Sequence, residues 1–593
     1  MQWLKICILL FIPMAIYIPT TPASAEGEFA RIITLSDAEQ RLVSTPEPYS
    51  YNNYLTFALL ASGVPESQIP RYKGAVDQLA TALAKGIETK RVSNAPEERA
   101  EFILEWLHLN FFKRYSPHQT RIDQMLEHRT FNCVSSGVFY NVMCRKFGMH
   151  TTGVIVPDHV FSQLKMPREK IDIETTIRYG FDPTSKKDLF DEFGRLTGFV
   201  YVPQKNYRQR SEIGDKEMIA LIYSNRYKEL SDRRRYAEAA KVLYVGWRLA
   251  GDLPRSLNTW ESAIGNYIVD LDRSRQFTDA LYVADEAIRR FPDLRRPAEL
   301  RRTIYTNWSY HSLRTKQYDE AIRILKQGLS VFPRDPRLLQ NLKAAYLENA
   351  QALGKAGRFS EARAVVEMGR QKFPREEKFR KVGLNLYIRE AEKLPIAAAA
   401  TLYQNALQKY PQEAVLLEAF AFLYIEPAQE LGNQGKYEEA IQLLDQSEKL
   451  MPMSPKIGKA KVAIYNNWSI NLTKEKDFAK AKLVIERGLA ISPADATLRN
   501  NGSYVLLQWA DFEFKNGRFD QATAILLEGL KKAKSDRAMF LQTIEAYYNE
   551  SAVQLLKRGE IKKGAERLMA GLKIVPHSKV MKDNLKLVRQ QQR

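Results

Sequence analysis

A unit of 41 residues repeats through the C-terminal two-thirds of the chain. Each copy has an aromatic residue, an alanine three positions later, a stretch with helical spacing and a closing proline. The opening aromatic residues are Tyr236, Phe277, Tyr318, Phe359, Tyr437, Phe478 and Phe519, each 41 residues from the next except across one gap of 78. That gap holds a weaker copy near Ile396, and a degenerate copy runs from Glu560 to Pro576. A fixed period of this length indicates stacked units rather than one globular core.

Each unit is predicted to contain two helices. Apolar residues recur at helical spacing in both halves of a copy. Small residues allow the helices to approach closely, and they are Ala321, Ala362, Ala440 and Ala481. One such pair cannot bury its apolar faces alone, so neighbouring pairs must stack.

The unit resembles the tetratricopeptide repeat family, lengthened from 34 residues by about two turns in the first helix. The resemblance predicts an all-α tetratricopeptide-like solenoid over residues 213–593, with eight or nine repeats. It implies that the groove of the array binds a protein or peptide partner.

The first 25 residues have the layout of a secretory signal peptide. A short basic start precedes an apolar run from Ile6 to Ile18, and Ala23-Ser24-Ala25 provides a cleavage signal. The run is too short to span a membrane comfortably. We therefore expect a signal peptide at 1–25 and a soluble mature protein in the periplasm or outside the cell. An uncleaved anchor is the alternative.

Export makes the cysteines informative. Cys133 and Cys144 remain after cleavage, eleven residues apart in one predicted helix. At about 1.5 Å per residue they are roughly 16 Å apart, beyond the ~7 Å limit for a disulfide. A free thiol in an oxidising compartment is explained by a functional role.

The net charge of +20 is distributed along the chain. This pattern predicts a solvated basic surface, and association with an anionic envelope surface is the alternative. Export argues against nucleic acid as a partner. The oligomeric state is left open.

Two helical segments are predicted before the most informative stretch. One runs from Tyr51 to a break at Gly86, and the second covers 96–113. After that stretch, residues 181–212 form a basic, loop-rich exit, and a helix over 212–229 starts the array.

The stretch between residues 113 and 181 places a cysteine at the start of a helix. Asn132 is a favourable N-cap residue, so Cys133 is expected in the first turn of a helix that runs to Phe147. Gly148 is expected to stop that helix. The helix dipole favours a thiolate at this position.

Two strands and a hairpin are predicted to follow. Residues 151–156 and 160–164 alternate as strands, with His159 at the head of the second. A hairpin centred near Met166-Pro167 pairs His159 with Glu174 on one face. We therefore rank Glu174 first as the acid beside His159, Asp172 second and Asp182 third.

This order resembles the transglutaminase-like superfamily over about residues 95–190. In that superfamily a cysteine at a helix start is followed by a histidine and an acid on successive strands. The matched positions are Cys133, His159 and Glu174. The usual acid is Asp in an Asp-Pro-Thr run, where this chain has Glu174-Thr175-Thr176. The resemblance implies an α+β papain/transglutaminase-like domain, which we place at residues 26–212.

It also implies a thiol-dependent hydrolase or transamidase that acts on protein or peptide amides. His159 takes the proton of Cys133, Glu174 orients the imidazole, and a thioester forms. The backbone N–H of Cys133 is one oxyanion donor, and the sequence assigns no second donor. The alternative is an envelope scaffold in which a degenerate, non-catalytic fold and the repeats mediate protein–protein interaction.

No cofactor or metal is expected. The two remaining cysteines are not at the spacing of zinc ligands. No glycine-rich phosphate-binding loop is evident in the sequence.

Overall fold

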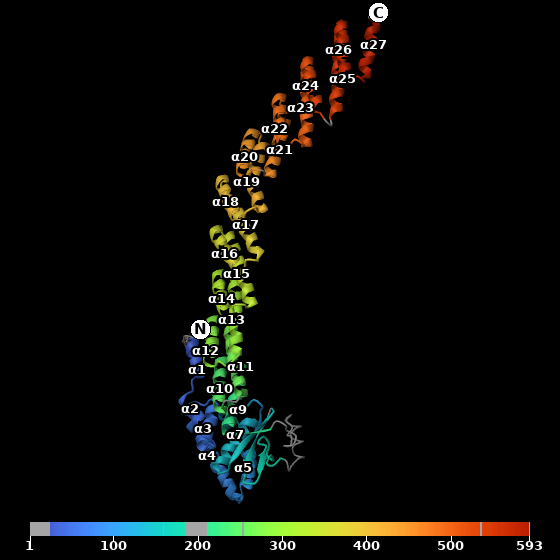
Figure 1. The fold of residues 1–593 in the computed structure, drawn as a ribbon. Coiled ribbons are helices and arrows are strands. Elements are labelled where there is room, and N and C mark those ends of the chain that lie inside the picture. The colour runs from blue at the N-terminus through green and yellow to red at the C-terminus, as the bar shows by residue number, and fades with distance from the viewer. Residues whose placement is uncertain are drawn as a thin grey trace, which may run out of the picture. The chain divides into compact units, whose positions relative to one another are not determined.

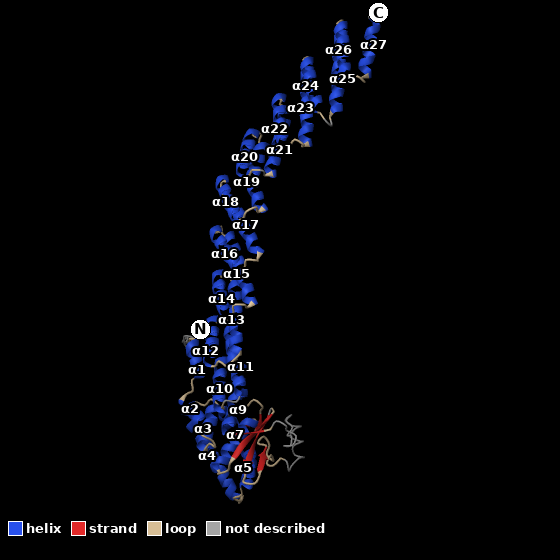
Figure 2. Cartoon of the chain, in the orientation of Figure 1, coloured by secondary structure: helices blue, strands red, loops and turns tan. Residues whose placement is uncertain are grey.

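The computed structural model describes residues 24–157, 159–183, 210–251, 254–452, 454–533 and 536–591. Nearly all of the predicted signal peptide lies outside these residues. The chain divides into two compact units, 1–345 and 346–593. The helices and strands are labelled in Figure 1, and every strand within the described residues belongs to the first unit (Figure 2).

The first unit begins with helices of 7 to 21 residues and small sheets, which together form an α+β region. Its helices before the repeats are α1 (Ala25–Ile33), α2 (Asp37–Ser44), α3 (Tyr51–Ala61), the 3-10 turn η1 (Glu66–Gln68), α4 (Ile69–Thr89), α5 (Pro96–Asn110), α6 (Ile122–His128) and α7 (Cys133–Lys146). Its strands are β1 (Arg114–Tyr115), β2 (Thr130–Phe131), β3 (Thr151–Val156), β4 (His159–Lys165), β5 (Lys170–Ile173) and β6 (Ser211–Ile213). The larger sheet has the order β5-β4-β3-β6 with antiparallel pairs, and α7 packs against β3 and β4.

The predicted helix break at Gly86 is wrong, because α4 continues through it to Thr89. A Cβ atom at Gly86 would lie 3.1 Å from Nε1 of Trp106 on α5. The glycine therefore allows α4 and α5 to pack closely. A glycine can end a helix or make room for a ring from a neighbouring helix, and only the packing distinguishes these two roles.

The core of the α+β region extends into the first repeat helices. One apolar cluster includes residues from Leu42 to Leu249, with contributions from α9 (Asp215–Asp232) and α10 (Tyr236–Ala250). A second cluster joins Phe29 and Ile32 of α1 to Trp260 in α11. The described N-terminal helix therefore packs on the repeats, and α9 closes the core beneath α7.

The repeats are pairs of helices that start where the sequence predicts. The second helices of the pairs are α10, α12 (Phe277–Arg290), α14 (Tyr318–Val331), α16 (Phe359–Lys372), α18 (Ile396–Lys409), α20 (Tyr437–Leu450), α22 (Phe478–Ile491), α24 (Phe519–Lys532) and α26 (Ile561–Ile574). The other array helices are α11 (Pro254–Arg273), α13 (Arg296–Arg314), α15 (Pro336–Lys355), α17 (Glu377–Ala391), α19 (Ala414–Asn433), α21 (Pro455–Lys474), α23 (Ala496–Lys515), α25 (Arg537–Lys557) and α27 (Lys579–Gln591). Every predicted aromatic residue is the first residue of a helix, which confirms the helix-pair repeat.

The irregular gap in the period has a local cause. Helix α17 has 15 residues, whereas α15 and α19 have 20 each. The copy that contains α17 is therefore shortened in its first helix, and the spacing of 41 residues resumes at Ile396. The repeat tolerates this change because each pair contacts mainly its neighbours.

A glycine recurs ten residues after the start of several second helices, a regularity beyond the predicted alanines. It is found at Gly246, Gly328, Gly369, Gly488, Gly529 and Gly571. A Cβ at Gly529 would overlap the ring of Phe540 on α25, and Phe540 is fully buried. The missing side chain thus provides the space into which the next helix packs.

Gly529→Ala is expected to destabilise the second unit. Alanine gains about 1 kcal/mol of helix propensity, but overpacking against an immobile ring costs about 1–3 kcal/mol. Thermal unfolding followed by circular dichroism should show a lower Tm. Gly458→Ala in α21 is the matched control, because its Cβ would meet its nearest neighbour at an ordinary 3.7 Å. A Tm for Gly529→Ala at or above that of the control would contradict this packing role.

Candidate active site

Cys133 is held at the head of α7 by a capping box. Asn132 Oδ1 accepts from the backbone N–H of Ser135 at 2.9 Å, and Ser135 Oγ accepts from the backbone N–H of Asn132 at 2.9 Å. Asn132 Nδ2 also donates to Thr120 Oγ1 at 2.7 Å. Gly148 has φ +77° directly after the helix. The predicted start and stop of this helix are confirmed.

The imidazole of His159 contacts a carboxylate and interacts electrostatically with the thiol. Its Nε2 is 2.6 Å from Oε2 of Glu174, and the two side chains are 12% and 2% exposed. Cys133 also acts electrostatically on the imidazole, because it favours the charged form of His159. The structure therefore brings together the three residues that the sequence ranked first.

This arrangement favours a charged imidazole. Burial, the largest influence, lowers the pKa of His159, but the charge of Glu174, its hydrogen bond to His159 and the interaction with Cys133 outweigh burial and raise the pKa to about 10. Burial likewise works to raise the pKa of Glu174, yet His159 and Thr176 together hold it below its ordinary value. A buried carboxylate and imidazolium in contact stabilise each other's charged forms.

The register of the hairpin differs from the predicted one by two residues. The prediction of His159 opposite Glu174 places Ser162 opposite Ile171, whereas the structure pairs Ser162 with Ile173. A slip of two residues preserves the alternation of faces, so Glu174 remains on the side of His159. Glu174 follows the last residue of β5 and meets His159 from the loop beyond the strand.

The loop that carries Glu174 is anchored at three points. Glu174 Oε1 accepts from the backbone N–H of Thr176 at 3.0 Å and from its hydroxyl at 2.5 Å. Thr175 Oγ1 lies 2.8 Å from Ser136 Oγ on α7. The carbonyl of Thr175 is 3.1 Å from Nε2 of His108 on α5. These contacts fix the carboxylate relative to the helix that carries the cysteine.

His108 is a supporting residue that sequence reasoning missed. Burial, the main influence, lowers its pKa to about 4, so its ring is neutral and Nε2–H donates to Thr175. The ring packs edge-on against Phe112 and Phe131. Only the tertiary contact with Thr175 identifies it, because a histidine in an apolar helix carries no distinctive spacing.

The two alternative acids make other contacts. Asp172 forms a two-point ion pair with Arg210, at 2.7 and 2.5 Å, and accepts from Gln163 Nε2 at 2.8 Å. Asp182 has φ +45°, and its backbone N–H donates to the carbonyl of Asp172 at 3.0 Å. Asp172 therefore supports the hairpin, while Glu174 holds the position beside His159.

The second cysteine differs from the first in its surroundings. Cys144 is fully buried, and burial raises its pKa to about 12, whereas Cys133 is partly exposed. Cys144 is therefore an inert core residue at neutral pH.

Across the described ranges, no group of three His, Cys, Asp or Glu side chains could hold a metal ion. No helix in the described part of the chain combines the length and apolar character that a membrane span requires.

The His159–Glu174 pair makes stability depend on pH. The raised pKa of His159 gives a contribution that is complete below pH 6.5 and lost as pH rises towards about 10. The lowered pKa of Glu174 gives a second contribution to stability, which is present above pH 4.5 and lost as pH falls further. The free energies of unfolding of wild type and Glu174→Gln, measured in urea, should therefore differ most near pH 5–6. This difference should shrink towards pH 10. A difference that stays constant from pH 6 to pH 10 would contradict the charged pair.

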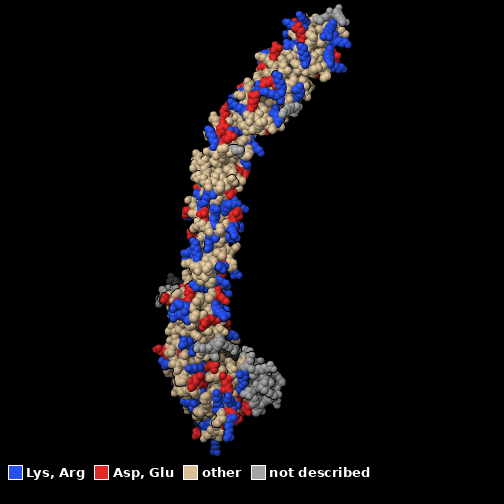
Figure 3. Space-filling view, in the orientation of Figure 1, with Lys and Arg blue, Asp and Glu red and all other residues tan. Residues whose placement is uncertain are grey.

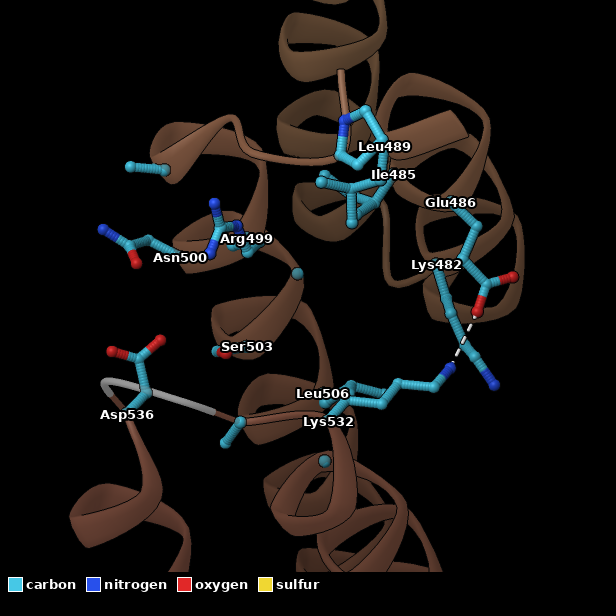
Figure 4. A pocket seen from close by; sticks show the side chains of 15 residues that line it. Lys482, Ile485, Glu486, Leu489, Arg499, Asn500, Ser503, Leu506, Lys532 and Asp536 are labelled. Carbon is cyan, nitrogen blue, oxygen red and sulfur yellow. Dashed lines mark hydrogen bonds and ion pairs between the residues drawn. The ribbon is translucent and has the colours of Figure 1, made fainter. Parts of the chain in front are cut away.

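The second unit contains a cavity of about 310 Å³ between α22, α23 and α24, lined by both charged and apolar side chains (Figure 4). Its lysines are already paired: Lys532 lies 2.9 Å from Glu486, and Lys482 lies 2.5 Å from Glu528. The two lysines therefore add no net charge with which the cavity could select a ligand.

Comparison with known proteins matches residues 70–186 to the family model described as the transglutaminase-like superfamily. A search of curated proteins finds no match. Among solved structures, a tetratricopeptide repeat protein from Parabacteroides merdae is 15% identical and covers 49% of this chain and 98% of its own, with a TM-score of 0.16. Pseudomonas aeruginosa pilF is 16% identical over 41% of this chain and 97% of its own, with a TM-score of 0.12. Scores this low support no inference about function.

The matched range includes every residue of the cluster around Cys133, and the helix pairs after it keep the 41-residue period. Residues 70–186 therefore form a transglutaminase-like domain, which is followed by helical repeats of the tetratricopeptide type.

Proposed function

We propose that this protein is an exported thiol-dependent hydrolase or transamidase that acts on protein or peptide amides. The observation that carries the proposal is the hydrogen bond between Glu174 and His159, together with the electrostatic interaction of His159 with Cys133 at the head of α7. A carboxylate that orients an imidazole beside a thiol is the arrangement that activates a nucleophile.

The chemistry follows from the protonation states. His159 holds a proton at neutral pH, and an imidazolium beside the sulfur favours the thiolate of Cys133. The sulfur attacks the amide carbonyl, and His159 protonates the departing amine, which leaves a thioester on Cys133. His159 then removes a proton from water or from an acceptor amine, giving hydrolysis or transamidation.

The repeat array supplies a surface for a protein partner or substrate. Between α21 and α23 lies a groove of about 470 Å³ that is lined by Lys474, Lys515, Tyr504 and neighbouring residues. Tyr504 is 55% exposed, which is unusual for a large aromatic side chain and typical of a contact surface. Figure 3 shows cationic and anionic side chains interspersed on the visible face. The net charge of +20 also suits association with an anionic envelope surface.

The test offers the full-length protein a glutamine-containing protein, such as denatured casein, with a fluorescent primary amine. Wild type should incorporate the amine or hydrolyse amide bonds, and mass spectrometry of the products distinguishes the two reactions. Cys133→Ala should lose the activity, and Cys144→Ala should retain it provided that the variant folds. Equal turnover by wild type and Cys133→Ala would refute a thiol mechanism. Cell fractionation with N-terminal sequencing tests export, since cleavage is expected after Ala25.

A further inference from the structure

The backbone of the site offers one oxyanion donor, and the thiol mechanism calls for a second. The backbone N–H of Cys133 is at the start of α7, where helical N–H groups have no intrahelical acceptor. A tetrahedral intermediate is stabilised best by two donors. The amide of Gln119, a nearby side-chain donor, is engaged with the carbonyl of Arg121 at 2.8 Å.

Tyr115 lies on β1, which pairs with β2, the strand that ends two residues before Cys133. Strands β1 and β2 are parallel, with Tyr115 opposite Phe131, and the backbone N–H of Ser116 donates to the carbonyl of Phe131 at 2.7 Å. Tyr115 is thus opposite the residue that lies two positions before Cys133 in the sequence.

Tyr115 and Cys133 belong to the same face of this strand pair. Paired residues of neighbouring strands point to one side, and alternate residues along a strand share that side. Asn132, between Phe131 and Cys133, is extended with φ −128° and ψ −174°, so the alternation continues to Cys133. The Tyr115 ring packs edge-on against Phe131, with centroids 6.0 Å apart.

The surroundings keep the phenol in its donor form. Burial, together with the charges of Cys133 and Glu174, raises the pKa of Tyr115 above its ordinary value. Both charges act on the phenol, which agrees with its position on the same face as Cys133. A protonated phenol donates a hydrogen bond, and a buried donor is worth more than one in water.

We propose that the hydroxyl of Tyr115 is the second oxyanion donor of this site. The proposal rests on the thiol mechanism above. The thiolate electron pair forms the S–C bond as the carbonyl π pair moves to oxygen, and this oxyanion accepts from Tyr115 O–H and Cys133 N–H. The carbonyl then re-forms as the C–N bond breaks, and the departing nitrogen takes its proton from His159.

Two reactions of the same sulfur test this role. Alkylation by iodoacetamide needs the thiolate but forms no oxyanion, whereas acylation by p-nitrophenyl acetate needs both. For Tyr115→Phe we expect acylation about 100-fold slower, the size found when one donor is removed from such a site, with alkylation changed less than about two-fold. Tyr51→Phe, which loses only a hydroxyl contact to Asp77, is the control and should leave both rates unchanged.

The two rates test the role of Tyr115 separately from the thiol mechanism. Equal acylation by wild type and Tyr115→Phe overturns the role of Tyr115 and leaves the thiol mechanism intact. A parallel fall in both rates overturns it too, because it indicates loss of the site's structure. A wild-type protein that alkylates but does not acylate overturns the proposed function, and the role of Tyr115 with it.

Discussion

His159→Ala is expected to slow alkylation of Cys133 by iodoacetamide about 30-fold at pH 7. In the wild type the imidazolium favours the thiolate, whereas a cysteine without such a partner is only a few per cent thiolate at this pH. Amide turnover should fall by a further 10²–10⁴-fold, roughly, because His159 also protonates the leaving amine. The two rates are measured by mass spectrometry of labelled protein and by amine release.

The control for this prediction is His118→Ala. His118 is exposed in the loop after β1 and should change neither rate. Equal alkylation by wild type and His159→Ala would show that the imidazole does not act on the sulfur. Cys133 would then react as an ordinary thiol, and the catalytic interpretation would lose its main support.

The second large effect is expected at the ion pair that joins α7 to α9. Asp215 is 2% exposed, contacts Arg145 at 3.0 Å and accepts from the backbone N–H of Tyr49 at 2.7 Å. Asp215→Ala leaves Arg145 buried without this partner and should lower the free energy of unfolding by about 3–5 kcal/mol. Urea unfolding followed by tryptophan fluorescence measures the loss.

The pair is costly to break without being a net source of stability. Burial raises the pKa of Asp215 despite the nearby Arg145, which means that its charged form is disfavoured in the fold. The double variant Arg145→Met with Asp215→Leu should therefore recover most of the loss. Arg41→Ala, which breaks an exposed pair with Glu66, should cost less than about 1 kcal/mol. A double variant as unstable as Asp215→Ala would contradict this explanation.

Local patterns predicted the elements that depend on short-range physics. The aromatic residues mark the first residues of second helices because the same two-helix unit is rebuilt in each copy. Asn132 caps α7 because its side chain reaches the free N–H groups of its own first turn. Cys133 and His159 could be chosen as candidates for similar reasons: one follows a cap and the other heads a strand.

Longer-range contacts were predicted less well. The face of Glu174 was correct, although the hairpin register differed by two residues, because strand alternation is insensitive to such a slip. Gly86 was assigned to a helix end, but its role is to accommodate Trp106 from another helix. Residue type alone does not reveal the packing partner.

The sequence by itself determined the period of the array, the helix pairs and the cap that presents Cys133, since each depends on residues within a few turns of one another. The tertiary structure alone decided that Asp172 pairs with Arg210, that His108 anchors the loop of Glu174, and that Tyr115 pairs opposite Phe131 on the face that Cys133 shares. The physical reason is distance along the chain: these contacts join segments whose approach depends on the packing of the whole core.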